Sequence, residues 1–416
     1  MVSIFGRCWR FDQRSNPAAS RFDKVKRMRK ISVDKSNPRA HNYSRNNNEH
    51  ELGKRERVLA GKYYSETKAG RSVKMTIKEI AELAGVHRAT VDKVLHNREG
   101  VSTDVRQRIQ QIIKEVGYTP NPAGRVLQQQ GKVYRIAAVL VEVDALEFIK
   151  QGIAQGVEKQ AGFNIEVEYH VTTFQDAEGQ SAILNRMIDQ GIDGIILSPI
   201  NSGRVRAAIN RAVDAGIPVV TANSDIDGTK RMCYVGMDGK RASRVAGRLM
   251  GQFLGGSGEV AIISSAVDAE NNNYYVSIRE QGFSSFIAQH YPDIHVVECI
   301  ESFEDPQITY QKTAEVLRQH PNLRGIYLTC GGAREVGRAL KESGRWKDIK
   351  VLSYEEYPFI LQLMREDVID CTLASELQRQ GELPIQVMMD DLVFDRQPER
   401  DEMFTEIKVL VKESLF

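Results

Sequence analysis

Apolar positions between Met75 and Gly117 repeat every three to four residues in three successive stretches. This period predicts amphipathic helices that each bury one face. Gly85 separates the first two stretches, because glycine adopts the backbone angles of a tight turn without a Cβ clash. Two helices joined by a short glycine-containing turn form a helix-turn-helix, so we expect an all-α headpiece with a third helix behind it. The predicted buried positions are Ile77, Ile80, Ala81, Ala84, Val86, Val91, Val94, Leu95, Val105, Ile109, Ile112, Ile113 and Val116.

From Tyr134 onward, short β-branched runs alternate with amphipathic helical stretches. We expect strands in RIAAVLVEV, IEVEYHV, GIIL, IPVVTANS, EVAIISS, HVVECI, GIYLTC and IKVLSY. Such alternation predicts parallel sheets covered by helices on both faces. The units are too many for one doubly wound sheet, so the sequence predicts a two-lobed α/β domain.

Residues 1–74 differ from the rest in composition, with 19 Lys and Arg against 7 Asp and Glu and few periodic apolar residues. High polarity without period favours a disordered extension, or sequence upstream of a true start at Met75. The basic runs KVKRMRK and GKRER leave an RNA-directed role open. The segment lacks the continuous apolar core of a secretory signal peptide. We therefore expect three parts: 1–74, a headpiece over 75–131, and a two-lobed domain over 132–416.

Overall composition indicates a globular protein of two or three domains, with 416 residues, 41% hydrophobic content and a net charge of +2. No apolar run approaches the roughly 18–20 residues of a membrane span, so no membrane partner is expected. The five cysteines include no CxxC pair, and their odd number suits a reducing cytoplasm. Over 75–131, Lys and Arg exceed Asp and Glu by only two (8 − 6), so placement matters more than bulk charge.

Sequence motifs of catalysis are absent. The chain contains no GxxxxGK[ST], HExxH or GxSxG motif, and its histidines do not cluster with cysteines at metal-ligand spacing. We therefore expect no enzyme activity, no metal and no cofactor.

The headpiece resembles the DNA-binding headpiece of the lactose-repressor family, through TIKEIAELAGV, HRATVDKVLH, a VS before the third helix, and GYTPNPAGRVL. In that family the second helix lies in the major groove of double-stranded operator DNA. The resemblance implies base-reading roles for Arg88, Ala89 and Lys93, which suits chemistry in which arginine and lysine read guanine and a small alanine touches a thymine methyl. It places Thr76, His87, Thr90 and Asn97 on or near backbone-contacting positions.

Two features near this block add to the resemblance. Asp92 replaces a usual serine, and its carboxylate is repelled by phosphates unless Arg88 or another cation screens it. Further along, the segment after the third helix resembles the hinge helix of the family, whose leucine wedges into the minor groove. Leu127 matches that leucine, with Arg125 beside it and Asn121 near the DNA backbone, although a plain packing role for Leu127 stays open.

Residues 134–416 resemble the ribose-type periplasmic sugar-binding proteins, which are also the effector domains of lactose-repressor relatives. The motifs are VTTFQDAEGQSAILNRMIDQGIDGIILSPINS, AGIPVVTANSDI and YVGMDG. The resemblance implies three crossovers between the lobes, near 237–239, 375–377 and 400–405. It also implies a ligand between the lobes, at the carboxyl ends of strands.

Polar and aromatic residues at the expected strand ends give the candidate effector site. Arg279 and Glu355 match the arginine and the acid of the ribose type, whereas Ser224, Ser375 and the Cys330–Gly331 pair depart from it. The effector is therefore expected to be another sugar, a polyol or a cyclitol, although strand-end polar groups also satisfy local backbone. The full set is Asp144, Glu147, Phe148, Asn223, Ser224, Asp225, Asn273, Arg279, Cys330, Gly331, Glu355 and Ser375.

Two classes of function follow. The first is a transcriptional regulator, expected to repress as a homodimer, in which an effector between the lobes controls affinity for the operator. The second is a small-molecule binding protein or enzyme with a helical protein-interaction module.

Overall fold

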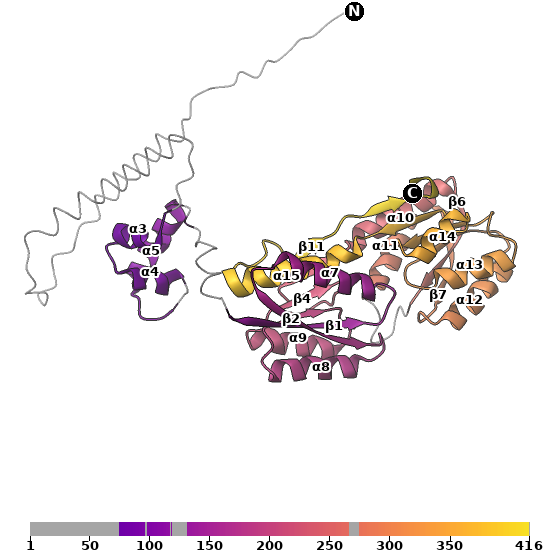
Figure 1. Cartoon of the computed structure of the whole chain (residues 1–416). Coiled ribbons are helices and arrows are strands. Elements are labelled where there is room, and N and C mark those ends of the chain that lie inside the picture. The colour runs from indigo at the N-terminus through magenta and orange to yellow at the C-terminus, as the bar shows by residue number, and fades with distance from the viewer. Residues whose placement is uncertain (1–74, 96–97, 117, 119–130, 266–273, 416) are drawn as a thin grey trace, which may run out of the picture. The chain divides into compact units, whose positions relative to one another are not determined.

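The computed structural model describes residues 75–95, 98–116, 118, 131–265 and 274–415 (Figure 1). The chain divides into two compact units, Met1–Thr119 and Pro120–Phe416, and each unit is described by itself. The predicted domain boundaries after residues 74 and 131 border stretches outside the described residues and stay predictions.

The first unit contains a helix-turn-helix followed by another helix, as predicted. Its helices are α3 (Ile77–Ala84), α4 (Arg88–Leu95) and α5 (Thr103–Val116). Thr76 and Glu79 form a capping box at the start of α3, in which Glu79 N donates to Thr76 Oγ1 at 3.3 Å and Thr76 N donates to Glu79 Oε2 at 2.7 Å. Gly85 ends α3 with a φ of 63°, a left-handed conformation that favours glycine.

The core of the first unit confirms the predicted helical faces. Its buried members come from all three described helices and are Ile80, Ala81, Ala84, Val91, Val94 and Ile109. The remaining predicted positions on α5 are only partly buried, because a domain this small shields one side of its last helix incompletely.

The second unit contains two six-stranded sheets, each forming the centre of one lobe (Figure 1). The first lobe has the order β11-β5-β4-β3-β1-β2, with every pairing parallel. Its strands are β1 (Val133–Val141), β2 (Asn164–Thr172), β3 (Gly194–Leu197), β4 (Val219–Ala222), β5 (Cys233–Gly236) and β11 (Glu402–Phe404).

The second lobe has the order β12-β10-β9-β8-β6-β7 and is parallel except for β12, which pairs antiparallel with β10. Its strands are β6 (Ser257–Ser264), β7 (Asp293–Glu301), β8 (Leu323–Leu328), β9 (Lys350–Tyr354), β10 (Cys371–Ala374) and β12 (Lys408–Leu410). The predicted two-lobed α/β architecture is thus confirmed.

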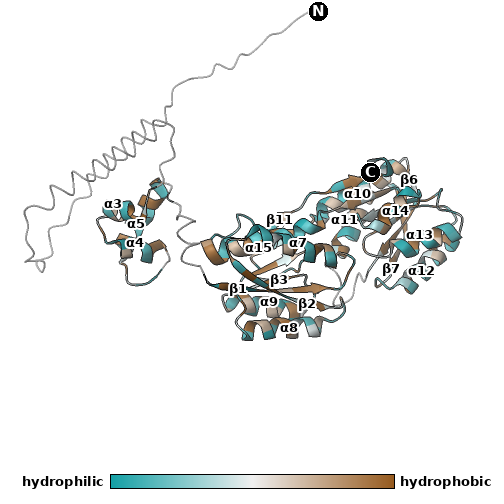
Figure 2. Ribbon diagram, viewed as in Figure 1, coloured by the Kyte–Doolittle hydropathy of each residue, from teal (hydrophilic) through white to brown (hydrophobic). Residues whose placement is uncertain are grey.

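Helices cover both faces of the sheets. The first lobe carries α7 (Leu146–Lys159), α8 (Ala177–Asp189), α9 (Gly203–Asp214) and α15 (Leu377–Phe394). The second carries α10 (Gly239–Phe253), α11 (Tyr274–His290), α12 (Pro306–Gln319), α13 (Ala333–Glu342), α14 (Pro358–Arg365) and the 3-10 turn Lys412–Ser414. Hydrophobic residues lie mainly on the strands and the inward helix faces (Figure 2).

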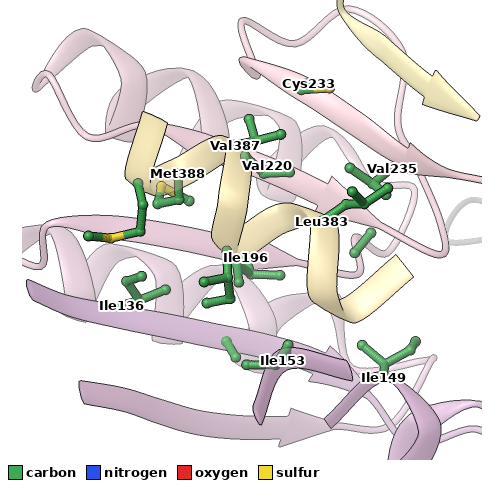
Figure 3. Packing of buried hydrophobic residues seen from close by; sticks show 14 of the residues in the cluster. Ile136, Ile149, Ile153, Ile196, Val220, Cys233, Val235, Leu383, Val387 and Met388 are labelled. Atoms are coloured by element: carbon green, nitrogen blue, oxygen red, sulfur yellow. The ribbon is translucent and has the colours of Figure 1, made fainter. Parts of the chain in front are cut away.

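One of the two hydrophobic cores of the first lobe lies between its sheet and the α7–α15 pair (Figure 3), and the other lies between the sheet and α8 and α9. Its labelled members are Ile136, Ile149, Ile153, Ile196, Val220, Cys233, Val235, Leu383, Val387 and Met388. Burying a side chain of this size contributes about 1.5–3 kcal/mol. The two helices cross closely, since a Cβ on Gly152 would lie 1.9 Å from the Gln378 carbonyl oxygen and one on Gly381 would lie 2.1 Å from that of Ile149.

The chain crosses between the lobes three times in the described part. The first two crossovers, 237–238 after β5 and 375–376 after β10, lie where the sequence predicts them. The third lies at 405–407, after β11 rather than at 400–405. The difference arises because residues 402–404 first add an edge strand to the first sheet.

Candidate functional site

The exposed face of α4 carries the predicted base-reading residues. Arg88 and Ala89 are exposed in its first turn, and Lys93 is exposed one turn later. Ala89 and Lys93 are four residues apart and therefore share a helix face. Val91 and Val94 are buried on the opposite face, so the three outer side chains are accessible to a partner.

The residues predicted to contact the DNA backbone lie next to helix ends. Thr76 caps α3, and the Nδ1 atom of His87 accepts a hydrogen bond from Ala89 N at 3.3 Å at the start of α4. Thr90 is half-buried. Thr76 and His87 thus have structural roles of their own, so a loss of DNA binding on their substitution needs a folding control.

The unusual acid on α4 has a cationic neighbour. Arg98 Nη1 lies 3.7 Å from Asp92 Oδ2, and both side chains are exposed. Arg98 is thus a cation other than Arg88 that is placed to screen this carboxylate.

Several predicted site residues lie outside the described residues and stay predictions. They are Asn97, Asn121, Arg125, Leu127 and Asn273.

Arg279 lies on α11 between the carboxyl ends of β8 and β9. Its Nη1 donates to the Thr329 carbonyl oxygen at 2.9 Å, and its guanidinium lies 3.8 Å from the ring centroid of Tyr354. Burial lowers the pKa of Arg279, but Glu355 and the nearby tyrosines, Tyr354 foremost, together more than offset this effect. Within the described part of the chain, its buried Nε has no hydrogen-bond partner. This arrangement leaves a fixed cation with an unused donor.

Glu355 follows β9 and is held by the second crossover. Its carboxylate accepts hydrogen bonds from Ser375 N at 3.1 Å and from Ser375 Oγ at 2.7 Å. Burial raises the pKa of this carboxyl, whereas Arg279 and Ser375 lower it by less. Its φ of 71° is left-handed, a strained conformation for a residue with a Cβ that is typical of functional sites.

A hydrogen-bond chain continues from the second crossover into the first lobe. Gln380 Nε2, on α15, donates to Ser375 Oγ at 2.7 Å and to Ser375 O at 2.8 Å. Its Oε1 accepts from Asn223 Nδ2, at the end of β4, at 3.1 Å. Thr405, on the third crossover, also donates to Ser375 O at 2.7 Å. The network joins polar groups of both lobes through two crossovers.

Two aromatic pairs also connect the lobes. The Phe148 ring, on α7, lies 5.7 Å from that of Tyr357 before α14. The Tyr234 ring, on β5, lies 5.0 Å from that of Tyr275 on α11. Predicted residue Phe148 therefore contacts the opposite lobe, as an aromatic residue between two lobes should.

Three further predicted residues follow the carboxyl ends of β1 and β8. Asp144 is exposed after β1 of the first lobe, and its charge raises the pKa of Tyr357 in the second. Cys330 lies with its Sγ 3.7 Å from Ser302 Oγ, and burial raises the pKa of its thiol. A Cβ on Gly331 would lie 3.2 Å from Glu304 Oε2, so the small residue makes room for that carboxylate.

Two of the predicted residues pair with local cations, and a third is half-buried. Glu147 has a 69% exposed side chain that pairs with Lys150 at 2.9 Å on α7. Asp225 is buried, with Oδ1 accepting from Arg231 Nε at 2.7 Å. Ser224 is half-buried. Glu147 and Asp225 are thus occupied by local ion pairs, and contact of all three with an effector stays a prediction.

Three residues of this region were not predicted from the sequence: Gln380, Glu304 and Tyr357. Glu304 follows β7, so the strand-end rule applied to HVVECI would have found it. Gln380 lies inside a helix, where only the tertiary structure brings it to Ser375.

No helix in the described part is long and apolar enough to cross a membrane, and no group of acids, histidines or cysteines there is arranged to hold a metal.

Comparison with family models matches two segments of the chain. Residues 136–394 match the periplasmic binding protein domain, and residues 76–121 match the bacterial regulatory proteins of the lacI family. Among solved structures, an ABC transporter solute-binding protein from Burkholderia graminis in complex with D-arabinose aligns with a TM-score of 0.63 and 26% identity, over 67% of this chain and 96% of that one.

Curated relatives include both regulators and binding proteins. Catabolite control protein A of Staphylococcus epidermidis is 26% identical over 176 residues, which cover 41% of this chain and 50% of that protein. The D-ribose/D-allose-binding protein of Pseudomonas aeruginosa is 23% identical over 234 residues, 54% of this chain and 71% of the relative. The chain thus spans about half the length of the regulators that it matches first.

Proposed function

Because the chain belongs to the periplasmic binding protein domain family and carries a lacI-family segment, we propose that it is a sequence-specific transcriptional regulator controlled by a small effector. The headpiece binds operator DNA, and a sugar, polyol or cyclitol binds between the two lobes. It acts in the cytoplasm as a homodimer and is expected to repress transcription. We propose no enzyme activity.

On the DNA side, the support is the exposed face of α4. Arg88 and Lys93 reach guanine edges in the major groove, and Ala89 touches a thymine methyl. Thr76 and His87 lie at helix starts, where backbone N–H groups favour phosphate oxygens. The proposed hinge segment with Leu127 adds a minor-groove contact.

On the effector side, the support is the convergence of donors and acceptors from both lobes. Arg279 presents an unused Nε–H, and Glu355 is held in place by Ser375. Sugar hydroxyls need such paired donors and acceptors. Phe148 and Tyr357 supply apolar faces for a ring.

Coupling between the effector site and the DNA-binding headpiece follows if the effector contacts both lobes. An effector that touches Arg279 in one lobe and Asn223 in the other stabilises one lobe arrangement over another. In a dimer, this changes the spacing of the two headpieces. Effector and DNA must then alter each other's affinity by the same factor.

A single observation carries the proposal: one chain combines a lacI-family headpiece with a two-lobed sugar-binding fold. Neither part alone specifies effector-controlled DNA binding.

The test is selection of DNA sites by the full chain, followed by gel shifts with and without candidate sugars. We expect a near-palindromic site, a dimer on DNA, and a shift in affinity with at least one sugar. Full affinity in both Arg88→Ala and Leu127→Ala would instead favour a small-molecule binding protein with a protein-interaction module. Removing residues 1–74 should leave operator binding unchanged, which separates the regulator from an RNA-directed role for that segment.

A further inference from the structure

Gln380 is a buried amide of the interlobe network to which the proposed function gives no role. It is 1% exposed and lies on α15, where it contacts Ser375 of the second crossover and Asn223 of the first lobe. Both partners belong to the predicted effector set. The orientation of a side-chain amide follows from its partners, because its nitrogen only donates and its oxygen only accepts hydrogen bonds.

A backbone carbonyl sets the orientation of this amide. Ser375 O lies 2.8 Å from one terminal atom of the Gln380 side chain. Because a carbonyl oxygen only accepts hydrogen bonds, that atom must be the nitrogen Nε2. The same nitrogen donates to Ser375 Oγ at 2.7 Å, and this hydroxyl donates its own proton to Glu355. The oxygen Oε1 is therefore the end of the Gln380 amide that meets Asn223.

The orientation of Gln380 in turn sets that of Asn223. Gln380 Oε1 lies 3.1 Å from the nearer terminal atom of Asn223, which must be the donor Nδ2. The other terminal atom is the oxygen Oδ1. It makes no hydrogen bond to the described part of the chain and is not one of the buried unpartnered atoms there. Asn223 Oδ1 is therefore an accessible acceptor at the carboxyl end of β4.

The second and third crossovers hold Gln380 in this position. Thr405 Oγ1 donates to Ser375 O at 2.7 Å and lies 3.4 Å from Gln380 Nε2. In the first turn of α15, Gln380 N donates to Glu376 O at 3.2 Å. The backbone and both ends of the Gln380 amide are thus fixed. Turning the Asn223 amide over would place two acceptor oxygens against each other.

We propose that Gln380 is a positioning residue of the effector site, which holds Asn223 so that its carbonyl oxygen faces the ligand. The ligand group that meets Asn223 is then a donor, namely a free hydroxyl of a sugar, polyol or cyclitol. A phosphate, a carboxylate or an alkylated hydroxyl at this place leaves Asn223 Oδ1 without a donor. This inference rests on the proposed function, because it concerns the same effector site.

The second lobe presents the opposite polarity. Arg279 Nε is a buried donor without a partner in the described part of the chain. A ligand between Arg279 Nε and Asn223 Oδ1 therefore accepts from the second lobe and donates to the first. A hydroxyl can do both, whereas an ionised phosphate only accepts. The pair thus favours a neutral polyhydroxy ligand over its phosphate.

Equilibrium unfolding of the full chain in urea tests the amide orientation without a ligand. The variant is Asn223→Asp, which keeps the size and the oxygen Oδ1 of the side chain but replaces its N–H donor by a second acceptor against Gln380 Oε1. We expect the unfolding equilibrium constant at pH 7.5 to rise at least about tenfold.

Asn210→Asp is the matched control. Asn210 is half-buried like Asn223, but its Oδ1 accepts from Lys230 N at 2.7 Å, and an aspartate keeps that bond. Its unfolding constant should change less than about threefold. Asn223→Asp in a Gln380→Met background should also cost less than about threefold, because the opposing acceptor is gone. A general cost of placing a charge at position 223 would persist in that background.

Two outcomes overturn the amide orientation. The first is an Asn223→Asp protein as stable as the parent, since an oxygen that already met Gln380 would be kept. The second is an equal cost of Asn223→Asp with and without Gln380. The first comparison needs no Gln380 variant, so it decides the orientation even where Gln380→Met does not fold.

Isothermal titration calorimetry tests the ligand part. The probes are D-glucose, D-galactose, D-ribose and D-arabinose with their monodeoxyfluoro derivatives, because fluorine cannot donate a hydrogen bond. For a sugar that binds, we expect fluorine at one position to weaken binding at least about tenfold, and Gln380→Met to reduce this ratio below about threefold, since the freed Asn223 amide turns its N–H group to the fluorine.

A purely structural role of Gln380 would weaken all derivatives alike and leave that ratio unchanged. This result, or no binding of any of the four sugars, overturns the ligand part. The proposed function has a separate readout in gel shifts. A sugar that changes operator affinity with the same fluorine ratio in parent and Gln380→Met refutes the inference and leaves the regulator intact. Absence of DNA binding refutes the regulator and leaves the amide orientation, which unfolding measures without DNA.

Discussion

The Ser375 hydroxyl donates a hydrogen bond to Glu355 Oε1 at 2.7 Å. The same hydroxyl oxygen accepts a hydrogen bond from Gln380 Nε2, also at 2.7 Å. Ser375 lies on a crossover between the lobes, so one small side chain links an acid of the second lobe to an amide of the first. Any movement of one lobe against the other must preserve or break this link.

Replacing Ser375 with alanine should destabilise the protein. The change leaves the Glu355 carboxylate and the Gln380 amide each short of a partner, at a cost of about 1–3 kcal/mol. Urea unfolding of the parent and the variant measures this change in the free energy of unfolding. Ser343→Ala is the matched control, because that exposed hydroxyl makes only local backbone hydrogen bonds at the end of α13, and its loss should cost less than about 0.5 kcal/mol. Equal costs in the two variants would contradict a special role for Ser375.

Arg279→Ala should abolish the effector response and leave operator affinity intact. Losing hydrogen bonds from a charged donor weakens ligand binding by roughly 1.5–3 kcal/mol. Arg279→Lys keeps the charge but loses the planar stack on Tyr354, and should recover part of the affinity. Arg334→Ala removes a comparable stacked arginine from the exposed face of α13 and serves as the control. A normal effector response in Arg279→Ala places the site elsewhere.

Arg88→Ala should relax base preference at one position of the operator, with a loss of about 1–3 kcal/mol there. Lys114→Ala, on the exposed side of α5, should leave the preferred sequence unchanged. Selection of DNA sites by each variant gives the comparison. An identical sequence profile for Arg88→Ala and the parent protein would refute the assignment of Arg88 to base reading.

Gly236→Ala should destabilise the first crossover. A Cβ at this position would lie 1.9 Å from the Tyr234 hydroxyl oxygen, so the ring that packs on Tyr275 must move. Overpacking of this kind costs about 1–3 kcal/mol. Gly162→Ala is the control, since a Cβ there meets nothing within 4 Å. Thermal unfolding of both variants tests the difference, and an unchanged Gly236→Ala protein would show that Tyr234 adapts without cost.

Glu304→Gln should make the ligand-free protein more stable at pH 7. Burial raises the pKa of this carboxyl in the folded state, so the folded protein binds the proton more tightly than the unfolded chain does. The resulting stabilisation is present at low pH and is lost as pH rises through the folded-state pKa. The advantage of Glu304→Gln should therefore disappear below about pH 4. Melting curves of variant and parent from pH 3.5 to 8 measure this difference in stability. A variant less stable than the parent at pH 7 would contradict the prediction.

Local pattern was sufficient for most elements of both units. The helical period found α3, α4 and α5, and β-branched runs found β1 to β4 and β6 to β9. The strands β5, β10, β11 and β12 were not among the predicted strands, because each has at most one β-branched residue, whereas the equally short β3 and β4 have two or three. The third crossover lies later than predicted because β11, which the sequence analysis missed, pairs with β5 over residues 402–404.

The sequence by itself determined the class of the protein, a helix-turn-helix headpiece joined to a two-lobed α/β domain, and the strand ends at which we propose that a ligand binds. Those features depend on residue order, glycine placement and hydrophobic period, which are local. Only the tertiary structure decided which strand-end side chains meet. It engaged Asp225 with Arg231, turned Glu147 to Lys150, and brought Gln380 to Ser375 and Glu304 beside Gly331. These outcomes depend on contacts between residues far apart in the chain, which the order of residues does not reveal.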